Sequence, residues 1–242
     1  MFIIQNSSEL LYHIILTVID FHLEPSGSKR AVYILGTRAT IEAAKDSAFR
    51  VLHTLRYKPD DFAEYAIHSS HVGSWDHGNG VLVYAKAPAG QVFLVSIQTT
   101  PNTELLLADR DGAILLPHGI PSLHYVTQTV IDYNKDRTGC VQEMQIEGTF
   151  IHRADARKTA RKLLDPLDYA EYDTPEKMKG SGHMGRTSLH MRSQKMERIP
   201  LLRSRMSLIR ITSMEKISKR DSLVGRSWHS EIVWHFFFAW VL

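Results

Sequence analysis

Two stretches of this chain repeat one pattern of residues. The first is Tyr33–Thr37 (YILGT), which is followed by Phe62–Tyr65 (FAEY). The second is Gln145–Thr149 (QIEGT), which is followed by Tyr169–Tyr172 (YAEY). An internal repeat constrains a fold more than a single motif does, because each copy should form the same supersecondary unit. The sequence therefore predicts two units of one architecture.

Each copy continues from its Gly-Thr pair into an alanine-rich segment with the character of an amphipathic helix. In residues 40–52 the apolar side chains recur at helical spacing, at Ile41, Ala44, Ala48 and Val51. Thr40 precedes this run and is a suitable N-cap. Residues 154–164 repeat the composition, and Asp155 there complements the positive end of a helix dipole. We expect one helix in each copy.

Runs of β-branched and aromatic residues alternate with turn residues elsewhere in the chain. Residues 81–86 and 92–98 flank the turn APAG and predict a β-hairpin. Residues 123–133 and 140–146 flank the turn NKDRTG and predict another. Each unit then reads strand, helix, strand and hairpin, and residues 101–121 form a loop-rich connection. This order predicts an α+β fold with mostly antiparallel sheet.

The repeat divides the chain into four parts. We expect an N-terminal extension at residues 1–30 and a first repeat unit at residues 31–122. A second unit, truncated, is expected at residues 123–180, followed by a basic tail at residues 181–242.

The N-terminal extension is apolar but is not expected to cross a membrane. Its run from Leu10 to Leu23 contains His13, Asp20 and His22, and it is too short for a spanning helix. It also lacks the basic start and the small residues at a cleavage site that mark a signal peptide. We interpret it as an amphipathic helix or as an incorrectly assigned start of the gene.

The tail does not continue the second copy as the repeat predicts. A counterpart of the 81–98 hairpin should follow Tyr169–Tyr172, but residues 180–242 are rich in Met and Ser and show neither the strand nor the helix period. We therefore expect the second unit to lack its hairpin, which would leave its last strand as an unpaired edge at a cost in stability. The tail is predicted to be disordered or out of frame.

A shift of reading frame near Gly180 explains such a tail. We take the third base of each codon with the first two bases of the next. In that frame Met184-Gly185 must encode Gly, because the Met codon ends in G and Gly codons begin with GG. Met196-Glu197 must also encode Gly. The two forced glycines fall at the spacing of Gly78 and Gly90 in the first copy. The coding DNA distinguishes a genuine tail from a displaced frame.

The basic balance of the chain comes from this tail. The formal net charge is +3, but acidic residues outnumber basic ones in residues 1–178, and the reverse holds in residues 179–242. A basic patch is the electrostatic footprint of nucleic-acid binding. A displaced frame explains this one more simply, so nucleic acid is not an expected partner. The apolar ending Ile232–Leu242 is short for a membrane anchor. The partner stays unknown, and self-association of a two-unit protein is left open.

Few residues carry a signal for catalysis or metal binding. The single cysteine, Cys140, excludes an intramolecular disulfide and a cysteine-based zinc site, and it favours the reducing cytoplasm. The segment 78–80 (GNG) precedes a strand and is interpreted as a turn. Four polar residues in the loop before the 81–98 hairpin are more typical of a solvated loop than of a metal site; they are His68, His71, Asp76 and His77. No catalytic residue, metal or cofactor is assigned.

Binding candidates come from the aromatic and acidic residues. Trp75, Tyr84 and Tyr125, together with Phe93, would line a small-molecule cavity between sheet and helices, with Glu64 or His77 as the polar group. Aromatic residues on strands more often pack in a core, and FAEY is also typical of a half-buried structural strand. The speculative binding set is Glu64, Trp75, His77, Tyr84 and Tyr125.

These features support two functional hypotheses. The first is an intracellular protein that acts as a non-catalytic binding or interaction module. The alternative is a small-molecule-binding protein or a non-redox enzyme of specialised metabolism. A flat, exposed patch would favour the first, whereas an enclosed pocket with two convergent titratable groups would favour an enzyme.

Four elements of the sequence together resemble an uncharacterised group of filamentous-fungal proteins built from two such units. They are Gly36-Thr37, FAEY, the WxxG motif at Trp75–Gly78 and the segment VLVYAxAPAG at residues 81–90. The resemblance covers about residues 31–178 and implies a lineage and a duplicated α+β fold. It implies no catalytic residues.

Overall fold

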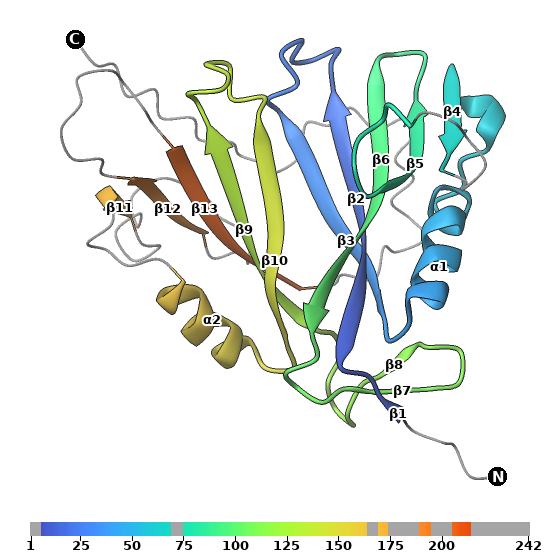
Figure 1. The fold of residues 1–242 in the computed structure, drawn as a ribbon, viewed down its shortest axis with the longest axis vertical. Coiled ribbons are helices and arrows are strands. Elements are labelled where there is room, and N and C mark those ends of the chain that lie inside the picture. Colours follow the sequence, from blue (N-terminus) through green and yellow to red (C-terminus); the bar gives the residue numbers. More distant parts are fainter. Residues whose placement is uncertain (1–5, 69–74, 164–168, 174–188, 195–204, 214–242) are drawn as a thin grey trace.

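Two five-stranded antiparallel sheets, each covered by one helix, form the body of the protein. A computed structural model describes residues 6–68, 75–163, 169–173, 189–194 and 205–213, the last three segments by their backbone alone. The layers run from helix α1 through the two sheets to helix α2 (Figure 1). The predicted α+β class with antiparallel sheet is confirmed.

The first sheet has the strand order β3-β2-β6-β5-β4, and all neighbouring strands are antiparallel. Its β5–β6 pair is the hairpin predicted at residues 81–98. The elements are β2 (Leu10–Asp20), β3 (Arg30–Arg38), α1 (Ile41–Thr54), the 3-10 helix η1 (Pro59–Asp61), β4 (Glu64–Ile67), β5 (Val81–Lys86) and β6 (Gln91–Pro101).

The second sheet has the strand order β10-β9-β13-β12-β11 and is also antiparallel. Its elements are β9 (His124–Asp132), β10 (Gln142–Phe150), α2 (Arg153–Lys162), β11 (Tyr169–Asp173), β12 (Leu189–Gln194) and β13 (Arg205–Ser213). The connection between the two sheets contributes to a small third sheet of β1 (Asn6–Ser7), β7 (Leu107–Ala108) and β8 (Ile114–Leu115).

The N-terminal region is a strand, so its interpretation as a helical extension is corrected. Residues Leu10–Asp20 form β2, which lies between β3 and β6 in the first sheet. This strand is buried on both faces, by α1 on one side and the second sheet on the other. A doubly buried strand has a continuous apolar run in place of the polar–apolar alternation, so the pattern does not distinguish it from a buried helix.

The tail supplies two strands to the second sheet, which corrects the expectation of a missing hairpin. Strand β12 pairs with β11, and β13 lies between β12 and β9. Strand β11 is therefore paired, and the expected cost of an unpaired β11 does not arise. Residues 181–188, 195–204 and 214–242 of the tail lie outside the described residues. The reading-frame hypothesis stays a prediction.

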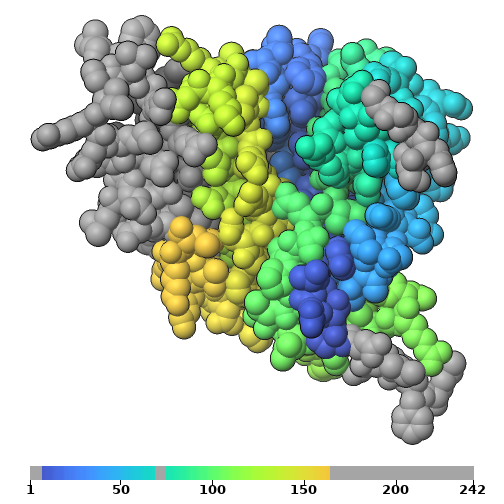
Figure 2. Space-filling view, in the orientation of Figure 1, coloured from blue at the N-terminus to red at the C-terminus, as the bar shows by residue number. Residues whose placement is uncertain are grey.

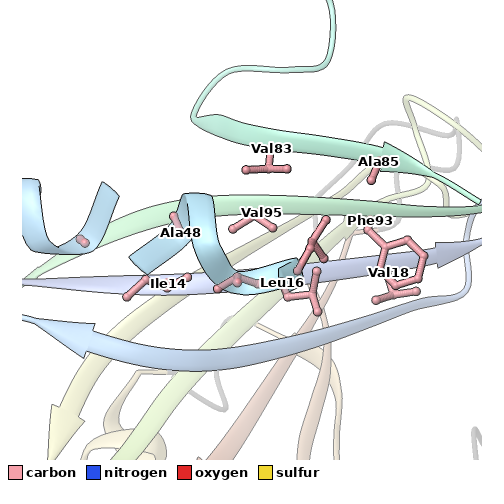
Figure 3. Close-up of a cluster of buried hydrophobic side chains, with 11 residues drawn as sticks. Ile14, Leu16, Val18, Ala48, Val83, Ala85, Phe93 and Val95 are labelled. Carbon is pink, nitrogen blue, oxygen red and sulfur yellow. The ribbon is translucent and has the colours of Figure 1, made fainter. Parts of the chain in front are cut away.

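Helix α1 covers the first sheet through small side chains. Thr40 is its N-cap as predicted, and the Thr40 hydroxyl accepts a hydrogen bond from the Ala43 N–H at 3.2 Å. Ala44 and Ala48 are fully buried, which lets the helix backbone approach the sheet closely. The strands contribute Ile14, Leu16, Val18, Val83, Ala85, Phe93 and Val95 to this core (Figure 3).

Enlarging Ala48 should therefore destabilise the protein. We expect Ala48→Leu to lower the free energy of unfolding by about 1–3 kcal/mol, because the added atoms have no space between helix and sheet. Urea unfolding measures the difference. Lys45→Leu, at an exposed position of the same helix, is the matched control. Equal midpoints for the two variants would contradict this packing.

The face of the first sheet away from α1 packs against the second sheet. The space-filling view shows the residues of β9, β10 and α2 to the left of the first sheet (Figure 2). Leu11, Ile15 and Ile34 form one apolar cluster with Tyr125 and Ile146 of the second sheet. The Gln98 side chain adds two polar contacts to β10, donating to the Met144 carbonyl and accepting from the Ile146 N–H.

A buried polar cluster lies at the centre of this interface. The two ring nitrogens of His13 lie 2.9 Å from the Thr37 hydroxyl and 2.8 Å from the Thr100 hydroxyl. Thr37 also contacts the Tyr125 hydroxyl at 2.8 Å. Thr149 of β10 reaches the His13 ring at 3.4 Å. Thr37 of the first sheet thus contacts Tyr125 of the second, and Thr149 of the second sheet contacts His13 of the first.

Candidate functional site

Four aromatic rings contact one another in series at the β4–β5 side of the first sheet. They are His68 after β4, Trp75 and His77 before β5, and Tyr84 within β5. The ring centroids are 4.9 Å apart for His68–Trp75, 4.7 Å for Trp75–His77 and 3.9 Å for His77–Tyr84. The first two contacts are edge-on, and the last is stacked with 16° between the ring planes. We call these four residues the ring cluster.

The ring cluster lies on the face of the first sheet opposite α1. Val83 and Ala85 pack in the core beneath α1, and side chains alternate along a strand, so Tyr84 points to the other face. Tyr65 of β4 also packs against the α1 core, which places its neighbour Glu64 on the same face as Tyr84. Strands β4 and β5 contribute no described residue to the apolar cluster between the sheets. The ring cluster therefore lies outside that interface.

Glu64 is joined to the ring cluster through Tyr84. Burial raises the pKa of Tyr84, and the nearby Glu64 charge and the hydrogen bond to the Glu64 carboxylate raise it further. The Tyr84 hydroxyl therefore stays protonated at neutral pH and serves as a donor, not as a base. The structure thus brings together four of the five predicted binding residues, namely Glu64, Trp75, His77 and Tyr84.

Trp75 carries a buried polar atom that finds no hydrogen-bond partner among the described residues. Its indole Nε1 is buried and has no hydrogen-bond partner within the described part of the chain. A buried N–H that makes no hydrogen bond costs about 1–3 kcal/mol.

A shallow cavity of about 460 Å³ that opens to solvent lies beside the ring cluster. The turn of the β5–β6 hairpin approaches the end of β2 here: a Cβ on Gly90 would lie 3.7 Å from the backbone N of His22. Gly90 has φ +99°, a conformation that side chains other than glycine rarely adopt. Tyr84 belongs to both the ring cluster and the cavity wall. The lining residues are Phe21, His22, Tyr84, Lys86, Gly90 and Val92.

Tyr125 lies apart from this surface, which corrects the predicted grouping. Its side chain is fully buried between the two sheets, and burial raises its pKa to about 12. Phe93 is likewise a core residue beneath α1. Both side chains lie in the interior because the strand faces on which they lie are covered, by the other sheet for Tyr125 and by α1 for Phe93. The predicted cavity lined jointly by Trp75, Tyr84 and Tyr125 is therefore not formed.

Sequence reasoning missed Phe21, His22 and Lys86 of the cavity wall. Lys86 lies directly opposite Glu64 in the β4–β5 register. The predicted hairpin at residues 81–98 does not include β4, so the place of Lys86 beside Glu64 depends on the β4–β5 pairing, which was not predicted. Phe21 and His22 had no local signal either, because their position depends on the β2–β6 pairing.

The loop before β5 was predicted to be a solvated loop and not a metal site. Among the residues that the structure describes, no group of three or more His, Cys, Asp or Glu side chains is placed to hold a metal ion. His71 lies outside the described residues.

Comparison with known proteins identifies no relative: no protein-family model, curated protein or solved structure matches this chain. Within the described residues, the helices are too short or too polar to cross a membrane.

Proposed function

We propose that this chain acts by binding and not by catalysis, and that it binds a small aromatic molecule at the ring cluster and the cavity beside it. The observation that carries the proposal is the series of four contacting rings on a sheet face outside the inter-sheet interface. Aromatic faces are effective surfaces for a planar ligand, because stacking adds about 0.5–1.5 kcal/mol to the burial of apolar area.

The chemistry of the site supports binding over turnover. The Tyr84 hydroxyl is engaged with Glu64 and its pKa is raised, so it offers no base at neutral pH. The cavity opens to solvent, whereas enzymes commonly exclude water from the reacting groups. The indole N–H of Trp75, which has no hydrogen-bond partner among the described residues, would instead suit an acceptor on a ligand.

We also propose that the two sheets are copies of one duplicated unit. Both have the order second, first, fifth, fourth and third strand, with a helix after the second strand. Their first hairpins share an irregularity of register, between Ile34 and Gly36 in one unit and between Ile146 and Gly148 in the other. On this proposal the ring cluster is a specialisation of the first unit.

Titration with 2-naphthamide, an uncharged planar probe, tests the binding proposal. We expect the indole ¹H–¹⁵N signal of Trp75, assigned with Trp75→Phe, to shift and saturate. Tyr84→Leu should weaken binding about fivefold through the lost ring contact, while Tyr133→Leu, at a half-buried tyrosine in the turn between β9 and β10, should leave the affinity unchanged. An unshifted Trp75 signal, or equal affinities for the two variants, would refute the ring cluster as a binding surface.

A further inference from the structure

We infer that the cavity beside the ring cluster selects a planar aromatic anion, in the simplest case an aryl carboxylate. This inference rests on the proposed function and adds the charge of the ligand to it.

The walls of the cavity provide surfaces for a flat ring. Phe21 and Tyr84 are aromatic, and Val92 forms an apolar part of the lining with 6 % of its surface exposed. His77 stacks on Tyr84 but does not line the cavity, so it supports the Tyr84 ring without occupying the ligand's place. A volume of about 460 Å³ lies within the range of small-molecule sites, roughly 300–1,000 Å³, and accommodates a two-ring compound.

The titratable groups of the lining favour an anion. Lys86 and His22 line the cavity, and no carboxylate does. Glu64 lies directly opposite Lys86 in the β4–β5 register. The Glu64 carboxylate accepts the hydrogen bond of the Tyr84 hydroxyl. In the described part of the protein the Lys86 ammonium forms no ion pair. It therefore offers a cation at the mouth of an aromatic cavity.

The backbone builds the site from segments that are distant in the sequence. The turn after β2 supplies Phe21 and His22, and the β5–β6 hairpin supplies the remaining walls. Gly90 holds the hairpin turn close to His22 in a left-handed conformation. The ring of the ligand would thus lie against Phe21 and Tyr84, with its carboxylate directed to Lys86.

Paired titrations of the full chain with 2-naphthoate and 2-naphthamide test the inference. The two probes share their ring system and differ in charge. We expect 2-naphthoate to bind about fivefold more tightly at low salt, a gain typical of a partly exposed charged hydrogen bond. Lys86→Met should remove this preference, so that the two probes bind with equal affinity. Lys45→Met, at an exposed lysine of α1, is the matched control and should keep the preference.

The outcomes separate this inference from the proposal on which it rests. Equal affinities of the two probes, or a preference that survives Lys86→Met, would overturn the anion selectivity while leaving the ring cluster as a binding surface. If neither probe shifts the Trp75 indole signal, both fail. Adding 0.5 M NaCl is a second test, because screening at about 4 Å of Debye length should weaken 2-naphthoate binding and spare 2-naphthamide.

Discussion

Lowering the pH from 7 to below 4 should remove about 3 kcal/mol from the free energy of unfolding through His13 alone. Burial lowers the pKa of this imidazole from 6.5 to about 4 in the folded chain. Between these two values the unfolded chain binds a proton that the folded chain does not. Stability is therefore unaffected by His13 above pH 6.5, falls as the pH drops towards 4 and has lost the full amount below it.

The surroundings of His13 explain why protonation is so unfavourable. The ring is fully buried, and its polar neighbours are Thr37, Thr100, Tyr125 and Thr149. None of these side chains is negatively charged in this pH range, so nothing nearby compensates an imidazolium.

Urea unfolding at several pH values measures this effect. His13→Gln keeps a polar side chain but has no group that titrates in this range. The free energy of unfolding of this variant should therefore change much less between pH 6.5 and 4 than that of the parent chain. His118→Gln, at an exposed histidine in the loop after β8, should retain the slope of the parent chain. A slope that persists in His13→Gln would show that other groups control the acid response.

Truncating Tyr125 should be the most damaging single substitution at the interface between the sheets. We expect Tyr125→Ala to lower the free energy of unfolding by about 3–5 kcal/mol, as for other large aromatic side chains removed from a core. The ring is fully buried in the inter-sheet cluster and meets His13 edge-on at a centroid distance of 5.6 Å.

A second substitution separates the ring from its hydroxyl. Tyr125→Phe retains the packing and removes the hydroxyl that contacts Thr37, so we expect a loss of about 1 kcal/mol. Tyr133→Ala, at a half-buried tyrosine of the same unit, is the control for loss of ring area. If Tyr125→Ala costs no more than Tyr133→Ala, the sheets are not held together at this point.

Elements with a clear local period could be predicted from the sequence. The alanines of α1 recur at helical spacing, and Thr40 caps the helix through its own side chain, so neighbouring residues suffice to specify it. The β5–β6 hairpin follows in the same way from β-branched residues around a Pro- and Gly-containing turn. Both signals are contained within a few residues.

Strand β2 could not be recognised in this way, and neither could β12 and β13. β2 is apolar on both faces because α1 and the second sheet cover it, so no alternation remains to reveal it. The tail strands carry basic and polar residues and are defined by pairing with β9 and β11. In both cases the partner that makes the segment a strand is remote in the sequence.

Some residues of the candidate site could be predicted from the sequence, whereas others are placed only by the tertiary structure. Glu64, Trp75, His77 and Tyr84 were identifiable by residue type within one repeat, and their sequence neighbourhood brings them to one sheet face. The pairing of the strands and the stacking of the sheets place Tyr125 in the core. They also place Phe21 and His22 in the cavity wall.

The order of residues along the chain was thus enough to specify the two helices and the hairpins β5–β6 and β9–β10, because those depend on contacts between near neighbours. The burial of His13 against Tyr125 depends on which sheet faces meet, and that is settled by the folding of the chain as a whole. Side chains of similar chemistry become core or site according to whether another layer covers them, and that information is spread over segments more than a hundred residues apart.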